Sequence, residues 1–297
     1  MKKLIVIGGP TASGKTGLAI ELAKHYNTEI INADSRQFYR NMNIGTAKPT
    51  QNELAAVKHH FIDTLDPKQD YNIGKYEIDA FQLIEELFKT NDHLILVGGS
   101  GLYIQAVCEG IDELPETDAA IRTKWKTIFE EKGISFLADE LKNKDPDYYK
   151  LVDIKNKHRL IRALEIIEQT GKTFSSFRKA VKKIRSFQTI KFSLDIEREI
   201  LYKRINQRVD RMIIEGLVEE VESLLPFRNY NALQTVGYSE IFSFLDGIEK
   251  LEDAIELIKK HSRNYAKRQL TWFRRDKEFN WLKPDNVNEF IEIIEST

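Results

Sequence analysis

The chain has 297 residues, a formal net charge of −1 at pH 7 and 41% hydrophobic residues, which is enough apolar material for a sizeable core. It contains no run of about 18 apolar residues, and Met1 leads within a few residues into an apolar strand pattern, so we expect no membrane span, no secretory signal and a cytoplasmic location. The single cysteine, Cys108, excludes an intramolecular disulfide and a zinc site built on paired cysteines.

The first predicted elements are a strand and a helix joined by a glycine-rich turn. An apolar run over residues 4–7 predicts a buried strand, residues 9–16 match G-x-x-x-x-G-K-[ST], and helical spacing of apolar residues follows over 15–25. Backbone amides of such a turn cradle phosphate, and its lysine and hydroxyl reach the outer phosphates and Mg²⁺. We therefore expect phosphate to be bound by Gly9, Pro10, Thr11, Ala12, Ser13, Gly14, Lys15 and Thr16, with Thr16 as the metal ligand. ATP is the default source of that phosphate.

Two more strand patterns follow, and each ends near a residue suited to bind a ligand. A strand over residues 29–33 ends at Asp34, a helix is predicted over 73–89, and a strand over 93–97 ends at two glycines before Ser100. Alternating strands and helices predict an α/β fold of the P-loop NTPase type, a parallel sheet flanked by helices. Ligands of such sheets bind beyond the carboxyl ends of the strands, so we expect the turn, Asp34 and Ser100 around one crevice.

The acidic residue of this crevice is not where a standard ATPase has it. The second metal-binding carboxylate of such enzymes closes an apolar strand, but here the strand LILVGG closes with glycine. Asp34 could hold metal through water, act as acceptor or base for an incoming nucleophile, or only cap the following turn with Ser35. The GGSG turn would let a ligand approach the backbone, where Ser100 could bind it, although a plain turn explains these glycines equally well.

The alternation of strands and helices stops near residue 112. Helical patterns continue to about residue 188, and an extended run over 189–195 predicts a strand that returns to the sheet. The expected parts are the first part of the core over 1–114, a helical insertion over 115–188, and the second part of the core with C-terminal helices over 189–297. Residues 122–211 include 23 Lys/Arg and 13 Asp/Glu, which is typical either of solvated helical faces or of a surface for a polyanion such as RNA.

Seven blocks of sequence together resemble one enzyme family. In chain order they are GGPTASGKT, NADSRQFYRNMNIGTAKP, HHFID, LVGGSGLY, RINQRVDRM, TVGY and AKRQLTWFRR. They resemble the tRNA dimethylallyltransferases, also called tRNA isopentenyltransferases or IPP transferases, over nearly the whole chain, and the single cysteine fits the bacterial type without a C-terminal zinc finger. The resemblance implies transfer of a dimethylallyl group from dimethylallyl diphosphate to N6 of the adenosine at position 37 of tRNA, just 3′ of the anticodon, with diphosphate released. It also implies Mg²⁺ as cofactor and the tRNA anticodon stem-loop as partner, and we expect a monomer.

The resemblance assigns roles to individual residues. Asp34 is implied as acceptor or base for the adenine N6, Ser100 lies beside the bond that breaks, and Arg208 helps to neutralise the diphosphate. The residues that match the loop receiving the flipped adenosine are Asp34, Ser35, Arg36 and Gln37. Further tRNA contacts are implied at Arg122, His158, Arg159, Leu160, Ile161, Arg162, Thr235, Val236, Gly237, Tyr238, Lys267, Arg268, Gln269, Thr271, Trp272 and Arg274. The last stretch interleaves basic and aromatic side chains, which suits phosphate pairing and base stacking, although burial of Trp272 in the core is as good an explanation.

Several features leave alternatives open. Ser239 follows TVGY where relatives often have a basic residue, which concerns one phosphate contact. The same chemistry on free AMP or ADP would not need the basic insertion, and a small-molecule kinase would need an acid at the end of LILVGG. A non-catalytic RNA-binding protein would leave Lys15, Asp34 and Arg208 without a purpose.

Overall fold

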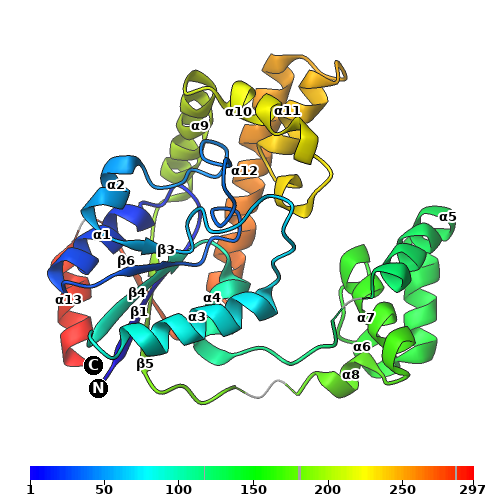
Figure 1. Cartoon of the computed structure of the whole chain (residues 1–297), viewed down its shortest axis with the longest axis horizontal. Coiled ribbons are helices and arrows are strands. Elements are labelled where there is room, and N and C mark those ends of the chain that lie inside the picture. The colour runs from blue at the N-terminus through cyan, green and yellow to red at the C-terminus, as the bar shows by residue number, and fades with distance from the viewer. Residues whose placement is uncertain (117, 180–181, 285) are drawn as a thin grey trace. The chain divides into compact units, whose positions relative to one another are not determined.

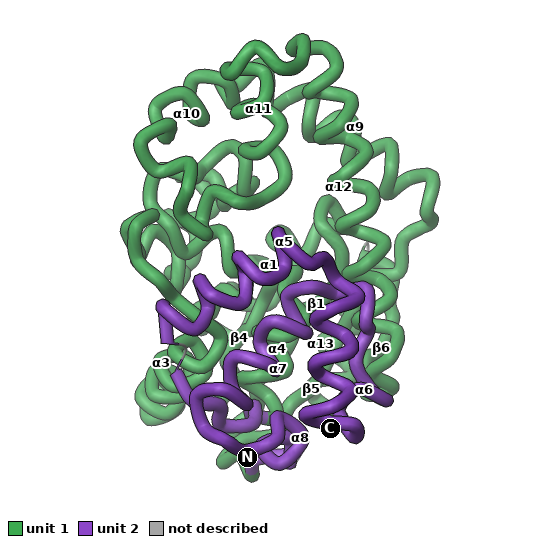
Figure 2. Tube along the Cα trace, turned by 90° about the vertical axis from the view of Figure 1, so that its right-hand side faces the viewer, with its two compact units in different colours: residues 1–109, 184–297 green, residues 110–183 purple. Residues whose placement is uncertain are grey.

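The computed structural model describes residues 1–116, 118–179, 182–284 and 286–297, and the chain divides into two compact units. Unit 1 comprises Met1–Glu109 and Ile184–Thr297, and unit 2 comprises Gly110–Lys183 (Figure 2). Unit 2 begins and ends a few residues before the expected insertion of 115–188. Its sequence has 16 Lys/Arg and 13 Asp/Glu, so the basic excess is small within the unit, because the arginine-rich segment after residue 197 lies outside it.

Unit 1 is built on a sheet that has six strands in the described part of the chain, all paired in parallel. The strands are β1 (Lys3–Gly8), β2 (Ile30–Asn32), β3 (His59–His60), β4 (His93–Gly98), β5 (Gln188–Leu194) and β6 (Phe279–Leu282). Their order is β3-β2-β4-β1-β5-β6, which confirms the predicted parallel sheet and the strand that returns to it (Figure 1). The edge strands β3 and β6 escape prediction because runs of two and four residues are too short to show a periodicity.

Helices cover both faces of the sheet. Because successive side chains of a strand point to opposite faces, the strands contribute to two hydrophobic cores, one on each face. Ile5 and Ile7 pack on one face with α1 (Lys15–His25) and α13 (Val287–Ser296). Leu4 and Val6 belong to the core of the other face, which includes side chains from α3 (Ile73–Leu87), α4 (Gly101–Glu109) and α12 (Leu251–Phe273). Because both faces are covered, the carboxyl ends of the strands are the place for a ligand site.

The other helices of unit 1 follow the loops around that edge. They are α2 (Gln51–Ala56), α9 (Arg198–Ile214), α10 (Leu217–Ser223) and α11 (Tyr238–Leu245), with turns of 3-10 helix at Leu225–Phe227 and Asn231–Leu233. Helix α12 packs against both α9 and α11, and the three lie side by side in Figure 1. The block RINQRVDRM lies in α9, TVGY leads into α11, and most of AKRQLTWFRR lies in α12. Residues of these three blocks can therefore reach the crevice from helices outside the sheet.

Unit 2 is helical and has a hydrophobic core of its own. Its helices are α5 (Ala119–Lys144), α6 (Pro146–Tyr149), α7 (Lys157–Thr170) and α8 (Phe174–Phe177). Gly133, with φ 77°, interrupts α5, and both halves of α5 contribute to a core shared with α7 around Trp125 and Leu164. In the described residues of either unit, no helix is long and apolar enough to cross a bilayer.

Candidate active site

The carboxyl ends of β1, β2 and β4 carry the residues expected around one crevice. The phosphate turn follows β1, Asp34 follows β2, and Ser100 follows β4. The Ser35 amide donates to Ser100 Oγ over 3.3 Å, and Arg208 Nη1 in α9 donates to Thr11 Oγ1 over 3.3 Å. The structure thus brings Asp34 and Ser100 close to the phosphate turn, as the order of strands predicts, and it places Arg208 against the turn, as the resemblance implies.

The phosphate turn presents the amino end of α1 to this crevice. Gly14, with φ 97°, immediately precedes the first helical residue, Lys15, so the amides of the first helical turn point out of the helix. Ala12 and Ser13 are buried in this turn. The Thr16 hydroxyl makes no hydrogen bond within the part of the chain that the structure describes. Open amides, a lysine and an open hydroxyl are the groups that bind phosphate at a helix amino end.

The crevice perturbs its ionisable groups in a way that favours an anionic ligand. Burial lowers the pKa of Lys15 to about 7, with Arg208 adding to the shift and Asp34 opposing it. Burial also raises the pKa of Asp34, although the nearby Lys15 opposes that change, and it lowers the pKa of Arg208. The Lys15 ammonium donates to the Pro10 carbonyl over 2.6 Å. A bound diphosphate would supply a negative charge next to Lys15 and Arg208 and so favour the charged form of both side chains.

We predict that diphosphate binding is coupled to proton uptake by Lys15. In the free protein, Lys15 loses its proton as the pH rises past about 7, and bound diphosphate would restore the proton by favouring the charged form. The affinity for inorganic diphosphate in EDTA should therefore fall as the pH rises from about 7 to 9. Calorimetry in buffers of different ionisation enthalpy measures the uptake, and Lys15→Met corrects for the titration of diphosphate itself. Equal uptake by both proteins would contradict the prediction.

The crevice offers Mg²⁺ a sparse set of protein ligands. In the described residues, the group of three carboxylates close enough to share an ion is Glu109, Asp276 and Glu278, but Lys191 Nζ already lies 2.7–3.0 Å from all three. Near the phosphate turn, Thr16 supplies a hydroxyl. Because Mg²⁺ usually keeps several waters and binds through one or two protein groups plus substrate phosphates, this set fits an ion held mainly by a bound diphosphate.

The loop after β2 is held so that Asp34 keeps one oxygen open. Asp34 Oδ1 accepts from the Arg36 amide over 3.2 Å, whereas Oδ2 accepts from no group among the described residues. The Arg36 guanidinium donates to the carbonyls of Asn231 over 2.7 Å and Ala232 over 3.3 Å. Gln37 Nε2 donates to the carbonyls of Thr46 and Ala47, each over 3.1 Å. Arg36 and Gln37, expected to contact tRNA, are therefore bound to their own chain in this structure, where they shape the loop.

Tyr265 is a neighbour of the crevice that the sequence analysis did not single out. Burial together with the Asp34 charge raises the pKa of its hydroxyl to about 12, and the neighbouring Ser100 opposes that shift. Ser100 Oγ also donates to Ser35 Oγ over 3.4 Å. Tyr265 immediately precedes the AKRQLTWFRR block. It lies one helical turn before Gln269, and this spacing is the sequence feature that could have indicated that the two side chains share one face of the helix.

Of the six residues of AKRQLTWFRR that were expected to contact tRNA, two pack inward and four face solvent. Gln269 is buried, and its Oε1 accepts from the Thr11 amide while its Nε2 donates to the Gly99 carbonyl, both over 2.9 Å. A Cβ on Gly101 would lie 2.1 Å from Trp272 Cδ1, so Trp272 packs against the start of α4. Gly99 and Gly101 of GGSG thus make room for side chains of α12. The four of these six that are exposed, and so remain available to RNA, are Lys267, Arg268, Thr271 and Arg274.

We predict that Gln269→Leu destabilises unit 1 by about 1–3 kcal/mol, because it leaves the buried Gly99 carbonyl and the partly buried Thr11 amide without partners. Thermal unfolding followed by circular dichroism measures the change. Gln105→Leu, which alters an exposed glutamine of α4, is the matched control and should stay within about 0.5 kcal/mol of the wild type. Equal stability of the two variants would contradict the structural role of Gln269.

The TVGY block also contributes more to packing than its resemblance implies. Tyr238 is fully buried, and its hydroxyl donates to Glu220 Oε1 over 2.7 Å. The Gly237 amide donates to Glu240, which closes the amino end of α11. Tyr238 therefore offers no side-chain surface to tRNA, whereas Thr235 and Val236 remain partly exposed.

The predicted RNA contacts of unit 2 differ in how accessible they are. Leu160 and Ile161 are buried in its core, and His158 and Arg159 are exposed. Arg122 Nε donates to Glu165 Oε1 over 2.9 Å, and Arg162 donates to Glu165 over 3.4 Å and to the Pro115 carbonyl over 2.7 Å. Because Glu165 is buried, these two arginines compensate its charge, a role that the sequence analysis did not foresee.

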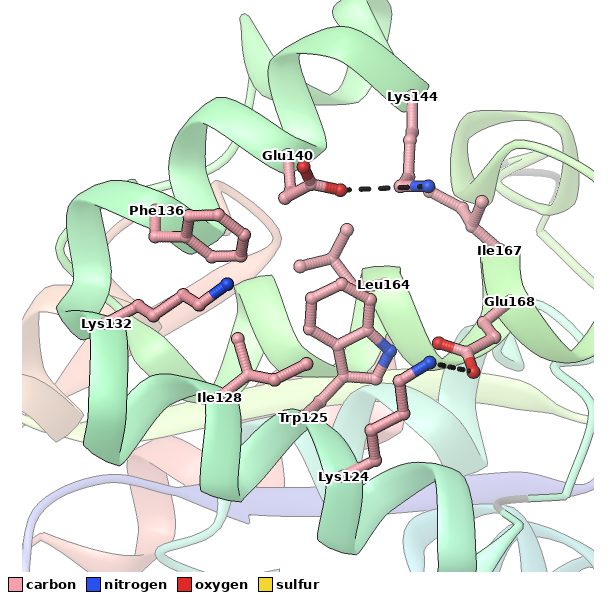
Figure 3. A pocket seen from close by; sticks show the side chains of 10 residues that line it. All are labelled: Lys124, Trp125, Ile128, Lys132, Phe136, Glu140, Lys144, Leu164, Ile167 and Glu168. Atoms are coloured by element: carbon pink, nitrogen blue, oxygen red, sulfur yellow. Dashed lines mark hydrogen bonds and ion pairs between the residues drawn. The ribbon is translucent and has the colours of Figure 1, made fainter.

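Unit 2 also has a pocket of about 370 Å³ between α5 and α7 (Figure 3). Its apolar side chains are Trp125, Ile128, Phe136, Leu164 and Ile167. Around them, Lys124 pairs with Glu168 over 2.7 Å and Lys144 with Glu140 over 3.7 Å, as the dashed lines in Figure 3 mark. None of the residues expected to contact RNA lines this pocket.

Comparisons with known proteins all identify similarity to one enzyme family. Residues 37–276 match the family model described as IPP transferase. Relatives named tRNA dimethylallyltransferase include one from Christiangramia forsetii, 51% identical over 99% of this chain and 97% of the relative, and one from Flavobacterium johnsoniae, 48% identical over 99% and 97%.

The solved structures that resemble this chain belong to enzymes of the same kind. The full-length tRNA isopentenylpyrophosphate transferase from Bacillus halodurans is 38% identical, with a TM-score of 0.73 over 100% of this chain and 95% of that one. A eukaryotic dimethylallyltransferase, described as acting on tRNA, is 29% identical, with a TM-score of 0.78 over 98% of this chain and 76% of that one.

Proposed function

The chain belongs to the IPP transferase family, and from that premise we propose that it is a tRNA dimethylallyltransferase, which transfers a dimethylallyl group from dimethylallyl diphosphate to N6 of the adenosine at position 37 of tRNA. The observation that carries the proposal is the pairing, in one crevice, of a phosphate turn with a carboxylate that has an open oxygen. A tRNA acceptor agrees with the names of the relatives, whereas neither free AMP nor a kinase substrate does.

The proposed donor site is the phosphate turn. Its amides, Lys15 and Arg208 would bind the diphosphate, and negative charge grows on the bridging oxygen as the allylic C–O bond breaks. Groups that already face that position stabilise the transition state more than the ground state. Diphosphate is therefore the leaving group that this turn is suited to hold.

The proposed acceptor site is the loop after β2. The adenine N6 forms the new C–N bond as the C–O bond breaks, and Asp34 Oδ2 would accept the proton that N6 loses. The raised pKa of Asp34 suits a group that takes up a proton during the reaction. Ser100 lies beside this carboxylate loop through its contact with Ser35 and would orient the reacting groups.

Mg²⁺ belongs to the same proposal, with Thr16 as its protein ligand. When bound, it would neutralise part of the diphosphate charge. A monomer and a cytoplasmic location, where tRNA is available, complete the proposal.

The proposal is tested by incubating the protein and Mg²⁺ with labelled dimethylallyl diphosphate and either unmodified tRNA or AMP. We expect label in tRNA and none in AMP. Label in AMP alone would assign the protein to free nucleotides, and ATP turnover without prenyl transfer would assign it to kinase chemistry.

A further inference from the structure

The loop that carries Asp34 is anchored at its far end by a single carboxylate from α10. Glu220 Oε2 accepts from the backbone amides of Asn43 and Ile44, each over 2.8 Å. Glu220 Oε1 accepts from the Gly45 amide over 3.0 Å. Three successive amides that converge on one point form a concavity of the kind that binds anions, and here the anion is a side chain of the protein itself.

Tyr238 completes this anchor from α11. Its buried hydroxyl donates to Glu220 Oε1 over 2.7 Å. A Cβ on Gly45 would lie 2.5 Å from the Tyr238 ring, so the loop backbone rests directly on that ring. Because one carboxylate joins the loop, α10 and α11, none of the three can shift without breaking charge-assisted hydrogen bonds.

The anchor is connected to Asp34 through the loop. Gln37 Nε2 ties residues 46 and 47 back to the Asp34 end, and the Arg36 guanidinium binds the carbonyls of Asn231 and Ala232. The loop of residues 34–47 is thus fastened at two places to the segment 217–238. Neither fastening involves the phosphate turn.

We propose that Glu220 is a positioning residue of the acceptor site: by binding the amides of residues 43–45 it holds the 34–47 loop, and with it Asp34, in the orientation that receives the target adenosine. This inference rests on the proposed function. It also gives Tyr238 a role, as the partner that orients Glu220, in place of the tRNA contact expected from the sequence.

The test is Glu220→Gln in the full chain. In one orientation the new NH2 group faces the Asn43 and Ile44 amides, and two hydrogen bonds are lost; in the other it faces the Gly45 amide, and one is lost, because the Tyr238 hydroxyl can accept from the NH2 group. Either way the anchor is weakened without a change in size. Because misplacement by about 1 Å can cost about 10²-fold, we expect kcat/KM for tRNA to fall by about 10- to 100-fold. The affinity for dimethylallyl diphosphate, measured by calorimetry, should stay within about twofold, since the phosphate turn is untouched.

Two further variants make the test specific. Glu222→Gln, an exposed residue of the same helix, is the control and should match the wild type. Tyr238→Phe removes one hydrogen bond of the anchor and should show the same split between tRNA and donor, but smaller, which keeps the proposal testable if Glu220→Gln does not fold.

Three results would overturn the proposal. Unchanged kcat/KM for tRNA in Glu220→Gln would show that the anchor does not position Asp34. Parallel loss of donor affinity would assign Glu220 a general structural role. An inactive wild type would instead overturn the proposed function, and this inference with it.

Discussion

Replacing Asp34 with asparagine is expected to lower the turnover number on tRNA by about 10²- to 10⁴-fold while leaving tRNA affinity nearly unchanged. The amide oxygen of Asn can still accept from the Arg36 backbone, so the loop should keep its shape. What disappears is the oxygen that would take the proton from adenine N6. Single-turnover kinetics with saturating donor, together with a tRNA binding isotherm, separate these two effects.

The matched control for this variant is Asp66→Asn. Asp66 Oδ1 accepts from the Lys68 amide over 2.9 Å, which repeats the turn geometry of Asp34 and Arg36 away from the phosphate turn. The control should retain wild-type turnover. Normal turnover of Asp34→Asn would remove Asp34 from the mechanism and leave it with the turn-capping role that the sequence allows.

Replacing Arg208 with methionine is expected to lower kcat by about 10²- to 10³-fold, because a cation aimed at the developing diphosphate charge is lost. Arg208 reaches the crevice from α9 through its contact with Thr11. Donor affinity should fall as well, whereas tRNA affinity should not change. Steady-state kinetics at varied dimethylallyl diphosphate concentration measure both effects.

Arg204→Met, an exposed arginine one helical turn earlier, is the control for this prediction. It removes the same charge from the same helix without touching the phosphate turn. If both variants lost the same activity, the effect would come from the net charge of α9, and Arg208 would have no specific role at the diphosphate.

The parts of the site that follow a strand were predictable, because local sequence determines them. A buried apolar run, a glycine turn and a helical pattern place Lys15 beyond β1, and the rule for parallel sheets places Asp34 and Ser100 at the same edge. The roles of these residues in the reaction stay predictions. To predict that these residues lie close together, only the order of strands and helices along the chain was needed, and not the packing of their side chains.

The inward-facing residues of the helices were not predictable in the same way. Gln269 and Tyr238 occur in blocks that resemble RNA-contacting stretches, yet both are buried and bind other parts of unit 1. The sequence of a helix does not tell whether a polar side chain faces solvent or a buried amide, because the direction of that side chain depends on how the helix packs against distant segments. Glu220 escaped notice for this reason, since the backbone amides that it binds lie more than 170 positions away in the chain.

The central claim is tested most directly by digesting tRNA after reaction and weighing its nucleosides. With protein, Mg²⁺, unmodified tRNA and dimethylallyl diphosphate, we predict that the adenosine 3′ of the anticodon gains one five-carbon unit on N6, and that Asp34→Asn nearly abolishes the gain. An unmodified adenosine at that position, with intact protein and donor, would contradict the account.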